Sequence, residues 1–227
     1  MTTHFIKKLR LPDAFKYKVP VLITSVYAVI WMHSTAPALA YTYLFLSIVT
    51  ITGIAGYAYL LNDWSDEQKD LIAGKSNATL GLSVIQKWGL LLLFGALAIV
   101  PWFYFPTTPF TLSLLVLELA LFAAYSLPPL RLKERPIIGV VVDALYAHVV
   151  PVILATATFG LLPSVAAYVA AINTKMVVMV AHWQFFNGIR NILLHQEEDR
   201  DKDIQSNTKT FATTYILDIT SSVIKAI

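Results

Sequence analysis

The 227-residue chain is 57% hydrophobic and only 14% charged, and its mean hydropathy is +0.64. Soluble domains carry about 25% charged residues, so this composition excludes a soluble globule and favours an integral membrane protein. A net charge of +3 without a long basic tract argues against a nucleic-acid partner, and the absence of cysteine excludes disulfides and thiolate metal ligands.

Long apolar segments alternate with short polar connectors along the chain. Each segment is close to the roughly 20 residues that a helix needs to cross the hydrocarbon core. Helices are required because lipid cannot hydrogen-bond an exposed backbone amide or carbonyl. We therefore predict an all-α, polytopic transmembrane bundle of about seven spans, forming a single domain over residues 1–227. The spans are expected at 19–37, 40–61, 81–105, 110–127, 137–159, 163–186 and 210–227.

Most charged residues gather in the N-terminal leader and in three connectors, within 63–87, 131–135 and 190–209. The connector at 106–109 contains no Asp, Glu, Lys or Arg. Because helices that each cross once place alternate connectors on opposite sides, the charged connectors share one face with the N-terminus. Their Lys and Arg residues assign that face to the cytoplasm.

The connector after the second span carries a stripe of acidic side chains. Asn62, Asp66 and Asp70 are spaced i, i+4, i+8, which places them along one face of a helix, with Asp63 beside them. Like charges at this spacing repel, and only Lys69 interleaves them. Mg²⁺ would remove the repulsion, because it takes carboxylate oxygens and often shares its coordination with substrate phosphates.

A second acidic stripe follows the sixth span, where Asp199 and Asp203 are again spaced i, i+4. Either stripe alone is more readily explained by a water-facing loop. Together, on one membrane face, they predict a site where divalent cations hold a diphosphate whose organic part lies in the bundle. Basic residues on this face are candidates for phosphate contacts, although the positive-inside rule alone explains most of them. They are Lys75, Arg131, Lys133, Arg135 and Lys209.

Glu118, Asp143 and Lys175 fall inside predicted spans, where an unpaired charge is costly. We expect them at the wall of an internal chamber, with a purely structural buried pair as the equal alternative. Lys175 is a candidate partner of Asp143, whereas Glu118 must pair or be protonated. Tryptophans near the span ends are expected to be interfacial anchors. These are Trp31, Trp88, Trp102 and Trp183.

Three segments, in this order, resemble the signatures of the UbiA-type intramembrane prenyltransferase family. Asn62-Asp63-x-x-Asp66-x-x-x-Asp70 is similar to its first aspartate motif, and Asp199-x-x-x-Asp203 resembles its second. The connector between its fourth and fifth helices is similar to Tyr125-Ser126-Leu127-Pro128-Pro129-Leu130-Arg131-Leu132-Lys133. The resemblance extends over residues 55–210.

This resemblance implies a helical bundle around a lipid-facing chamber, in which two Mg²⁺ ions bridge the aspartates and an isoprenyl diphosphate. Loss of diphosphate would leave an allylic carbocation, which a lipophilic and often aromatic acceptor captures. Lys75 and Lys133 would approach the diphosphate, and Tyr125 would stand at the reaction centre. Asn62 and Asp63 would support the first metal. By position, the metal ligands would be Asp66, Asp70, Asp199 and Asp203.

The chain also departs from the family pattern. Relatives commonly have nine spans, so a chain with fewer is expected to be truncated at its C-terminus or to complete its chamber by oligomerising. Many relatives carry an Arg-Pro pair after the first motif, where this chain has Gly74-Lys75-Ser76-Asn77. Two alternatives stay open: a non-catalytic prenyl-diphosphate-binding protein or partner subunit, and a transporter with acidic cytoplasmic loops. Neither the acceptor nor the prenyl chain length follows from the sequence.

Overall fold

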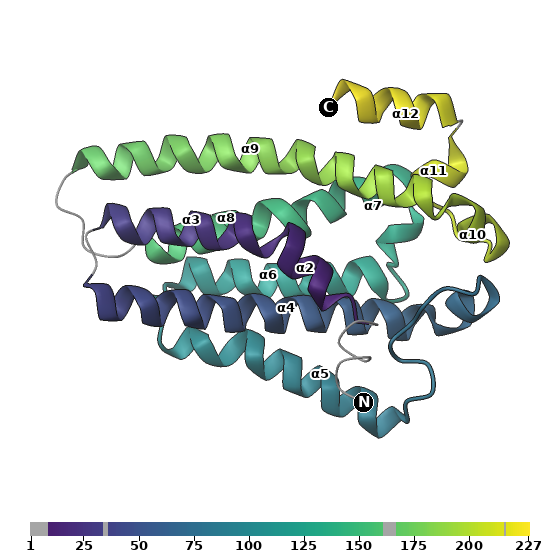
Figure 1. Ribbon diagram of the computed structural model, residues 1–227, viewed down its shortest axis with the longest axis horizontal. Coiled ribbons are helices and arrows are strands. Elements are labelled where there is room, and N and C mark those ends of the chain that lie inside the picture. The colour runs from purple at the N-terminus through teal and green to yellow at the C-terminus, as the bar shows by residue number, and fades with distance from the viewer. Residues whose placement is uncertain (1–8, 34–35, 161–166, 216) are drawn as a thin grey trace.

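The computed structural model describes residues 9–33, 36–160, 167–215 and 217–227, which fold as a bundle of helices and contain no strand (Figure 1). In chain order the α-helices are α2 (Leu11–Tyr17), α3 (Val19–Met32), α4 (Pro37–Ile72), α5 (Val84–Ile99), α6 (Pro109–Ser126), α7 (Pro136–Ala144), α8 (Val150–Phe159), α9 (Ala167–Glu198), α10 (Arg200–Gln205), α11 (Phe211–Thr214) and α12 (Leu217–Ala226). The 3-10 turns η1 (Val100–Phe103) and η2 (Leu132–Glu134) and the π-helical turn η3 (Leu145–Val149) connect some of them.

Two helices are much longer than the membrane core is thick. α4 has 36 residues and α9 has 32. At 1.5 Å per residue these lengths are about 54 and 48 Å, against roughly 30 Å of hydrocarbon. The predicted spans 40–61 and 163–186 therefore continue as helix, through the first acidic motif and up to the second. The start of the latter span falls on 161–166, outside the described residues.

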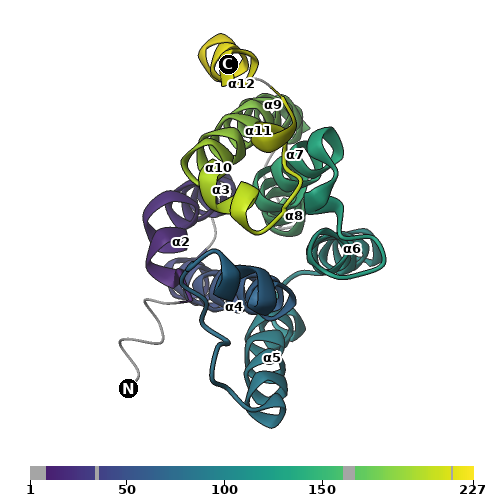
Figure 2. The ribbon, with the colours of Figure 1, turned by 90° about the vertical axis from the view of Figure 1, so that its right-hand side faces the viewer.

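Figure 2 looks along the bundle from the end that carries the acidic motifs. α3, α4, α6 and α8 each contact the next and close a ring, while α5 packs outside α4 and α12 outside α9. α5 approaches α4 closely at two glycines. A Cβ at Gly53 would lie 2.2 Å from the Ala98 amide nitrogen, and one at Gly56 would meet the Phe94 ring. Small residues at helix crossings are a common means of close packing between membrane helices.

An apolar chamber occupies the centre of this ring and encloses about 820 Å³ free of protein atoms, including its open part. It runs along α4 from Ser47 to Tyr59. At the end away from the acidic motifs its wall contains Phe105, which packs edge-to-face against Trp102 and Phe159. The prediction that Trp102 is an interfacial anchor is wrong, because its side chain is buried in this wall. The other three predicted anchors are exposed: Trp31, Trp88 and Trp183.

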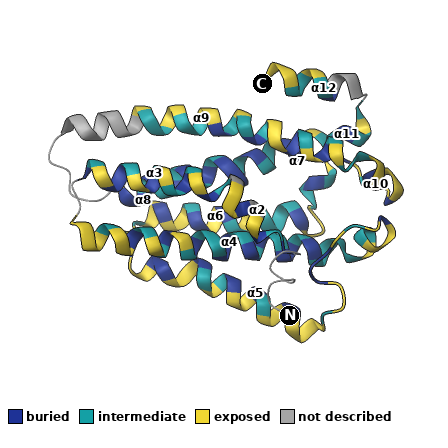
Figure 3. Ribbon diagram, viewed as in Figure 1, coloured by how far each residue is buried: buried dark blue, intermediate teal, exposed yellow. Residues whose placement is uncertain are grey.

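Four segments within the described part of the chain are long and apolar enough to cross a membrane: Pro37–Ile72, Val84–Phe103, Pro109–Ser126 and Pro136–Phe159. Their outer faces carry many exposed large apolar side chains, and Figure 3 shows exposed residues along α4, α5 and α6. Such an exterior suits lipid better than water. The length and composition of these helices support an integral membrane protein, whereas the predicted count of seven spans is not confirmed.

The prediction of one span over 210–227 is wrong. The segment forms α11, of 4 residues, and α12, of 10 residues, with extended backbone at Tyr215 between them. Thr210 and Thr213 form a capping box, in which side-chain oxygens satisfy backbone amides and start a separate one-turn helix. Neither helix is long enough to cross the hydrocarbon core, and α12 lies along α9 instead.

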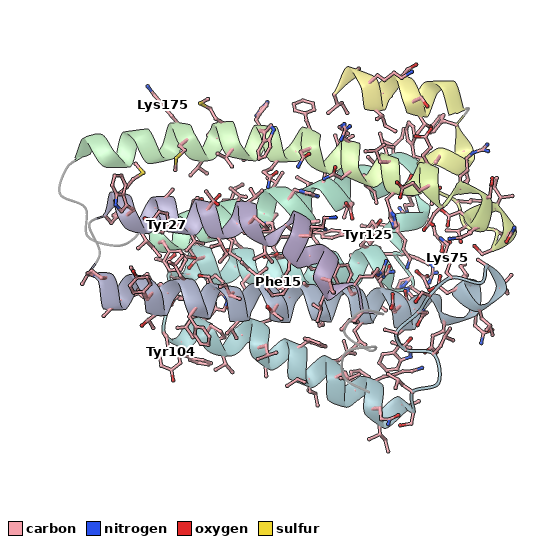
Figure 4. All side chains as sticks on the ribbon, viewed as in Figure 1. Phe15, Tyr27, Lys75, Tyr104, Tyr125 and Lys175 are labelled. Carbon is pink, nitrogen blue, oxygen red and sulfur yellow. The ribbon has the colours of Figure 1, made fainter. Side chains whose placement is uncertain are left out.

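The expected pairing of Lys175 with Asp143 is also wrong. Gly188 of α9 packs directly on Ala144, the residue after Asp143. Lys175 lies about 20 Å from Gly188 along α9 and is therefore far from Asp143. Lys175 is exposed at the opposite end of the bundle from the acidic motifs (Figure 4). Asp143 instead accepts a hydrogen bond of 2.5 Å from the Tyr146 hydroxyl.

Candidate functional site

The first aspartate motif occupies the C-terminal end of α4, on a helix as its spacing predicts. The helix ends where Gly74 adopts the left-handed conformation, with φ of 62°, and the Lys75 amide donates to the Asp70 carbonyl at 2.9 Å. Glycine suits this position because it has no Cβ to oppose a positive φ. This turn reverses the chain and places Lys75 at the end of the bundle near α10 (Figure 4).

The second motif ends in a similar turn. Asp199 is the N-cap of α10, and the Asp203 amide donates to its carbonyl at 2.9 Å, so the i, i+4 relation holds across the break after α9. Asn207 then adopts a φ of 51°, and the Thr208 amide donates to the Asp203 carbonyl at 2.8 Å. Each motif therefore has its last aspartate in the closing turn of a helix.

Lys75, in the turn that follows the first motif, pairs with both aspartates of the second motif. Its Nζ lies 2.7 Å from Asp203 Oδ1 and 3.0 Å from Asp199 Oδ2. Burial disfavours the charged amine, but the hydrogen bonds and charges of these carboxylates raise the pKa of Lys75 above its ordinary value. Burial likewise opposes the charge of Asp199, yet Lys75 holds the pKa of that carboxyl below its ordinary value. The structure thus brings the second motif to the end of α4.

Asp66 is held by cations from the connector after α6. Lys133 Nζ lies 2.5 Å from its Oδ2, and Arg131 Nη2 lies 2.6 Å from its Oδ1. Lys133 also donates to Asn62 Oδ1 at 2.9 Å. Burial outweighs the attraction of Asp66 and lowers the pKa of Lys133. A further anion beside this amine would stabilise its charged form.

Asp63 and Asp70 have a different set of partners. Asp63 is 1% exposed, and its two carboxylate oxygens accept from Arg10 Nη2 at 2.6 Å and from the Ala78 amide at 2.9 Å. Asn77 Nδ2 donates at 2.7 Å both to Asp70 Oδ2 and to the Asp63 carbonyl. Asp63 therefore anchors the leader and the loop after α4. The sequence patterns did not identify Arg10 or Asn77 as site residues.

Tyr125 lies at the C-terminal end of α6, toward the end of the bundle that carries the aspartate motifs (Figure 4). Its ring centroid is 5.0 Å from that of Tyr146, which also packs against Phe122 at 4.3 Å. Tyr146 and Phe122 line the chamber. Two tyrosine rings thus meet edge-to-face at the edge of the chamber, near the end of the bundle that carries the aspartate motifs.

Two predicted phosphate-binding cations lie outside this cluster. Arg135 and Lys209 are exposed, and across the described ranges no hydrogen bond or ion pair joins either side chain to the motif carboxylates. Lys209 shares a surface depression with Asp203. The cations that the structure does bring to the aspartates are Lys75, Arg131 and Lys133.

Among the described residues, no three or more His, Asp or Glu side chains form a ready metal-binding group. Mg²⁺ seldom uses an all-protein cage, and is usually held by one or two carboxylates with waters and substrate phosphates. The donors fit this pattern, since both motifs supply hard carboxylate oxygens at one end of the bundle. The like-charge repulsion predicted for the first motif is relieved by lysine and arginine, which are themselves phosphate-binding groups.

The chain matches the UbiA prenyltransferase family over residues 21–224. Its fold resembles a UbiA homologue from Archaeoglobus fulgidus bound to GPP and Mg²⁺, with a TM-score of 0.66, 15% identity, and coverage of 98% of this chain and 72% of that one. The same fold is found in a UbiA homologue from Archaeoglobus fulgidus bound to DMAPP and Mg²⁺, with a TM-score of 0.65, 16% identity, and coverage of 98% and 73%. No curated protein matches the chain. Because the family match covers most of its length, the chain belongs to the UbiA prenyltransferase family.

Proposed function

We propose that the chain is a Mg²⁺-dependent prenyltransferase that moves a prenyl group from an isoprenyl diphosphate to a lipophilic acceptor. One observation carries the proposal: Lys75, in the turn after the first aspartate motif, pairs with both aspartates of the second, so the two motifs lie together at one end of an apolar chamber. The two regions are adjacent, because Arg10, the partner of Asp63, lies 5.1 Å above the ring of Tyr59 in the chamber wall. A diphosphate needs the charged end with the aspartate motifs, and a prenyl chain needs the apolar chamber. The Archaeoglobus fulgidus homologues bound to GPP or DMAPP with Mg²⁺ support this ligand class.

The proposed Mg²⁺ ligands are the motif carboxylates, with Asn62 and Asp63 in supporting positions. Bound Mg²⁺ supplies positive charge for the oxygens of the departing diphosphate. Lys75 pairs with Asp199 and Asp203, and Arg131 and Lys133 pair with Asp66. We propose that these cations turn to the phosphate oxygens once the carboxylates take metal. Contact of Lys209 with the diphosphate stays a prediction. The four carboxylates are Asp66, Asp70, Asp199 and Asp203.

Aromatic and apolar side chains would protect the reacting carbon. Tyr125 and Tyr146 place two aromatic rings beside the acidic end, where π electrons would stabilise positive charge developing on the prenyl group. Asp143 accepts the hydrogen bond of the Tyr146 hydroxyl and so fixes the orientation of that ring. The apolar walls exclude water, which would otherwise capture an allylic carbocation.

The proposal places the acidic end and the N-terminus on the cytoplasmic face, because the Lys and Arg of the leader and of 131–135 favour that side. Lys7 and Lys8 of this leader lie outside the described residues. Residues 1–227 would form one transmembrane domain around one chamber, surrounded by membrane lipid. Oligomerisation that completes the chamber wall stays a prediction.

The test is release of diphosphate by the purified chain in detergent, supplied with Mg²⁺, labelled geranylgeranyl diphosphate and a panel of lipophilic acceptors. We expect release that requires both Mg²⁺ and an acceptor, and that is lost when Asp66→Ala is combined with Asp199→Ala. Asp201→Asn is the control, since this aspartate is exposed on α10. Binding without release with every acceptor would contradict transfer and favour a non-catalytic binder. Release that survives the double substitution would contradict the proposed site.

A further inference from the structure

Three buried polar atoms in the chamber wall lack a hydrogen-bond partner in the described structure: Thr50 Oγ1 on α4, Trp102 Nε1 on η1 and Glu118 Oε2 on α6. Their residues are 5%, 7% and 2% exposed. Buried polar groups almost always have partners, because an unsatisfied group forfeits its hydration without replacement. Three such atoms around one cavity therefore point to a ligand that fills it.

The chemistry of these three groups restricts the ligand. The Trp102 indole N–H can only donate, whereas the Thr50 hydroxyl can donate or accept. Glu118 forms no ion pair with a described residue, and a carboxyl group in apolar surroundings is held at lowest cost as the neutral acid, which donates. Lys18 also lines the chamber. It directly precedes α3, at the end of this helix that lies nearest the acidic motifs. The wall around Glu118 therefore favours an uncharged oxygen acceptor over an anion.

The three groups also lie well inside the chamber. Thr50 precedes Asn62 by a length of α4 that corresponds to about 18 Å, and Glu118 precedes Tyr125 by about 10 Å of α6. They are therefore separated from the reacting end that the aspartates define. A ligand that reaches them must be long and apolar, with an oxygen along its length or at its far end.

We propose that Glu118, Trp102 and Thr50 bind a neutral oxygen, in a carbonyl, ether or hydroxyl group, on an otherwise apolar molecule inside the chamber. The inference goes beyond the proposed function, because such binding needs neither Mg²⁺ nor diphosphate. It rests on the proposed function at one point only, which is the assignment of this oxygen either to the lipophilic acceptor or to the prenyl chain of the isoprenyl diphosphate.

The test compares three matched compounds on the purified full chain in detergent, without Mg²⁺ or diphosphate: a decyl-naphthoquinone, decyl-naphthalene and a decyl-naphthoate. Calorimetry gives each Kd. We expect the quinone to bind at least about fivefold more tightly than the hydrocarbon, as one hydrogen bond supplies, and the carboxylate to bind less tightly than the quinone. Equal affinities of quinone and hydrocarbon would overturn the inference.

Variants of Glu118 and Trp102 connect the preference to these side chains. Glu118→Gln should keep the quinone preference because an amide still donates, whereas Glu118→Leu and Trp102→Phe should each reduce it roughly fivefold. Removal of an unsatisfied group should leave Glu118→Leu at least as heat-stable as the parent, so this variant reports binding in a folded chain. A preference that persists in both Glu118→Leu and Trp102→Phe would also overturn the inference.

A final titration separates the two sources of the oxygen. The quinone is added in the presence of saturating prenyl thiodiphosphate, which resists loss of its leaving group, together with Mg²⁺. If the quinone and the prenyl thiodiphosphate bind together, the oxygen belongs to the acceptor. If each excludes the other, the oxygen site is part of the space that the prenyl chain occupies. Quinone binding without any prenyl transfer would count against the proposed function alone, and transfer without quinone preference against this site alone.

Discussion

Lys75 Nζ lies 2.7 Å from Asp203 Oδ1, although 128 residues separate the two in the sequence. This contact joins the loop after α4 to α10 and holds the two aspartate motifs at one end of the bundle. Lys75 is half-buried between two carboxylates, and their hydrogen bonds and charges raise its pKa, so the amine stays charged there. The same amine is therefore already positioned to meet a diphosphate.

Replacement of Lys75 by alanine should weaken binding of a prenyl thiodiphosphate in Mg²⁺ by about tenfold or more, because hydrogen bonds to charged groups contribute about 1.5–3 kcal/mol. Lys75→Arg should retain part of the affinity, since it keeps the charge but changes the geometry. Lys202→Ala is the matched control: its side chain is 51% exposed and lies 3.8 Å from Asp199. Calorimetric Kd values check the comparison, and an unchanged Kd for Lys75→Ala would contradict a phosphate-binding role.

Mg²⁺ and the diphosphate should stabilise the chain cooperatively. Because Lys and Arg already pair with Asp66, Asp199 and Asp203, Mg²⁺ alone must displace these cations, and Lys75 and Lys133 would then lack an anion partner among the described residues. The diphosphate provides that anion, so each ligand should tighten binding of the other. Thermal unfolding should show a larger rise in Tm with both than the sum of the separate rises, and excess EDTA should abolish the additional rise. A full rise with Mg²⁺ alone would argue against this exchange of partners.

The first motif could be predicted on a helix because its i, i+4, i+8 spacing is a local property of the chain. Its partners could not be predicted in the same way. Arg10 neutralises Asp63 from 53 residues away, and Lys133 reaches Asp66 from 67 residues away. Hydrophobic periodicity specifies which face of a helix is buried but not which distant cation meets a given carboxylate.

The spans show the same limit. Apolar length predicted long helices, four of which the described part of the chain contains, but it did not show that α4 and α9 are single helices longer than a membrane core is thick. It also treated 210–227 as one helix, since apolar residues on either side of Tyr215 outweigh the capping signals of Thr210 and Thr213. Hydropathy averages over a window, whereas a cap acts through individual hydrogen bonds.

Loss of Arg10 should destabilise the fold through Asp63. The carboxylate is 1% exposed, and without Arg10 its only remaining partner among the described residues is the Ala78 amide. Removing one member of a buried pair commonly costs about 3–5 kcal/mol, and the partial exposure of Arg10 favours the lower end of that range. Arg10→Ala should therefore lower Tm, and adding Asp63→Asn should recover part of the loss. An additive decrease in the double variant would show that the two side chains are not coupled.

Glu134 should make stability depend on pH. Burial alone would raise its pKa, but hydrogen bonds from Lys69 and Arg131 lower the pKa below its ordinary value. A depressed folded-state pKa contributes stability above the unfolded value, near 4.3, and that contribution is lost as the pH falls through the folded value. The Tm difference between the parent and Glu134→Gln should therefore shrink from pH 7 to pH 3. A difference that is constant over this range would rule out the ion pair as its source.

The close crossing of α4 and α5 gives a test of the fold that is independent of the site. A Cβ at Gly53 would lie 2.2 Å from the Ala98 amide nitrogen, and this backbone atom cannot move aside as a side chain can. Gly53→Ala should force the helices apart and destabilise the chain by about 1–3 kcal/mol. Gly95→Ala on α5 is the control, because its Cβ would meet nothing within 4 Å, and alanine is the better helix former by about 1 kcal/mol. Thermal unfolding in detergent should show a lower Tm for Gly53→Ala and an equal or higher Tm for Gly95→Ala. If both variants unfold at the parent Tm, α4 and α5 do not pack at the distance that the structure gives.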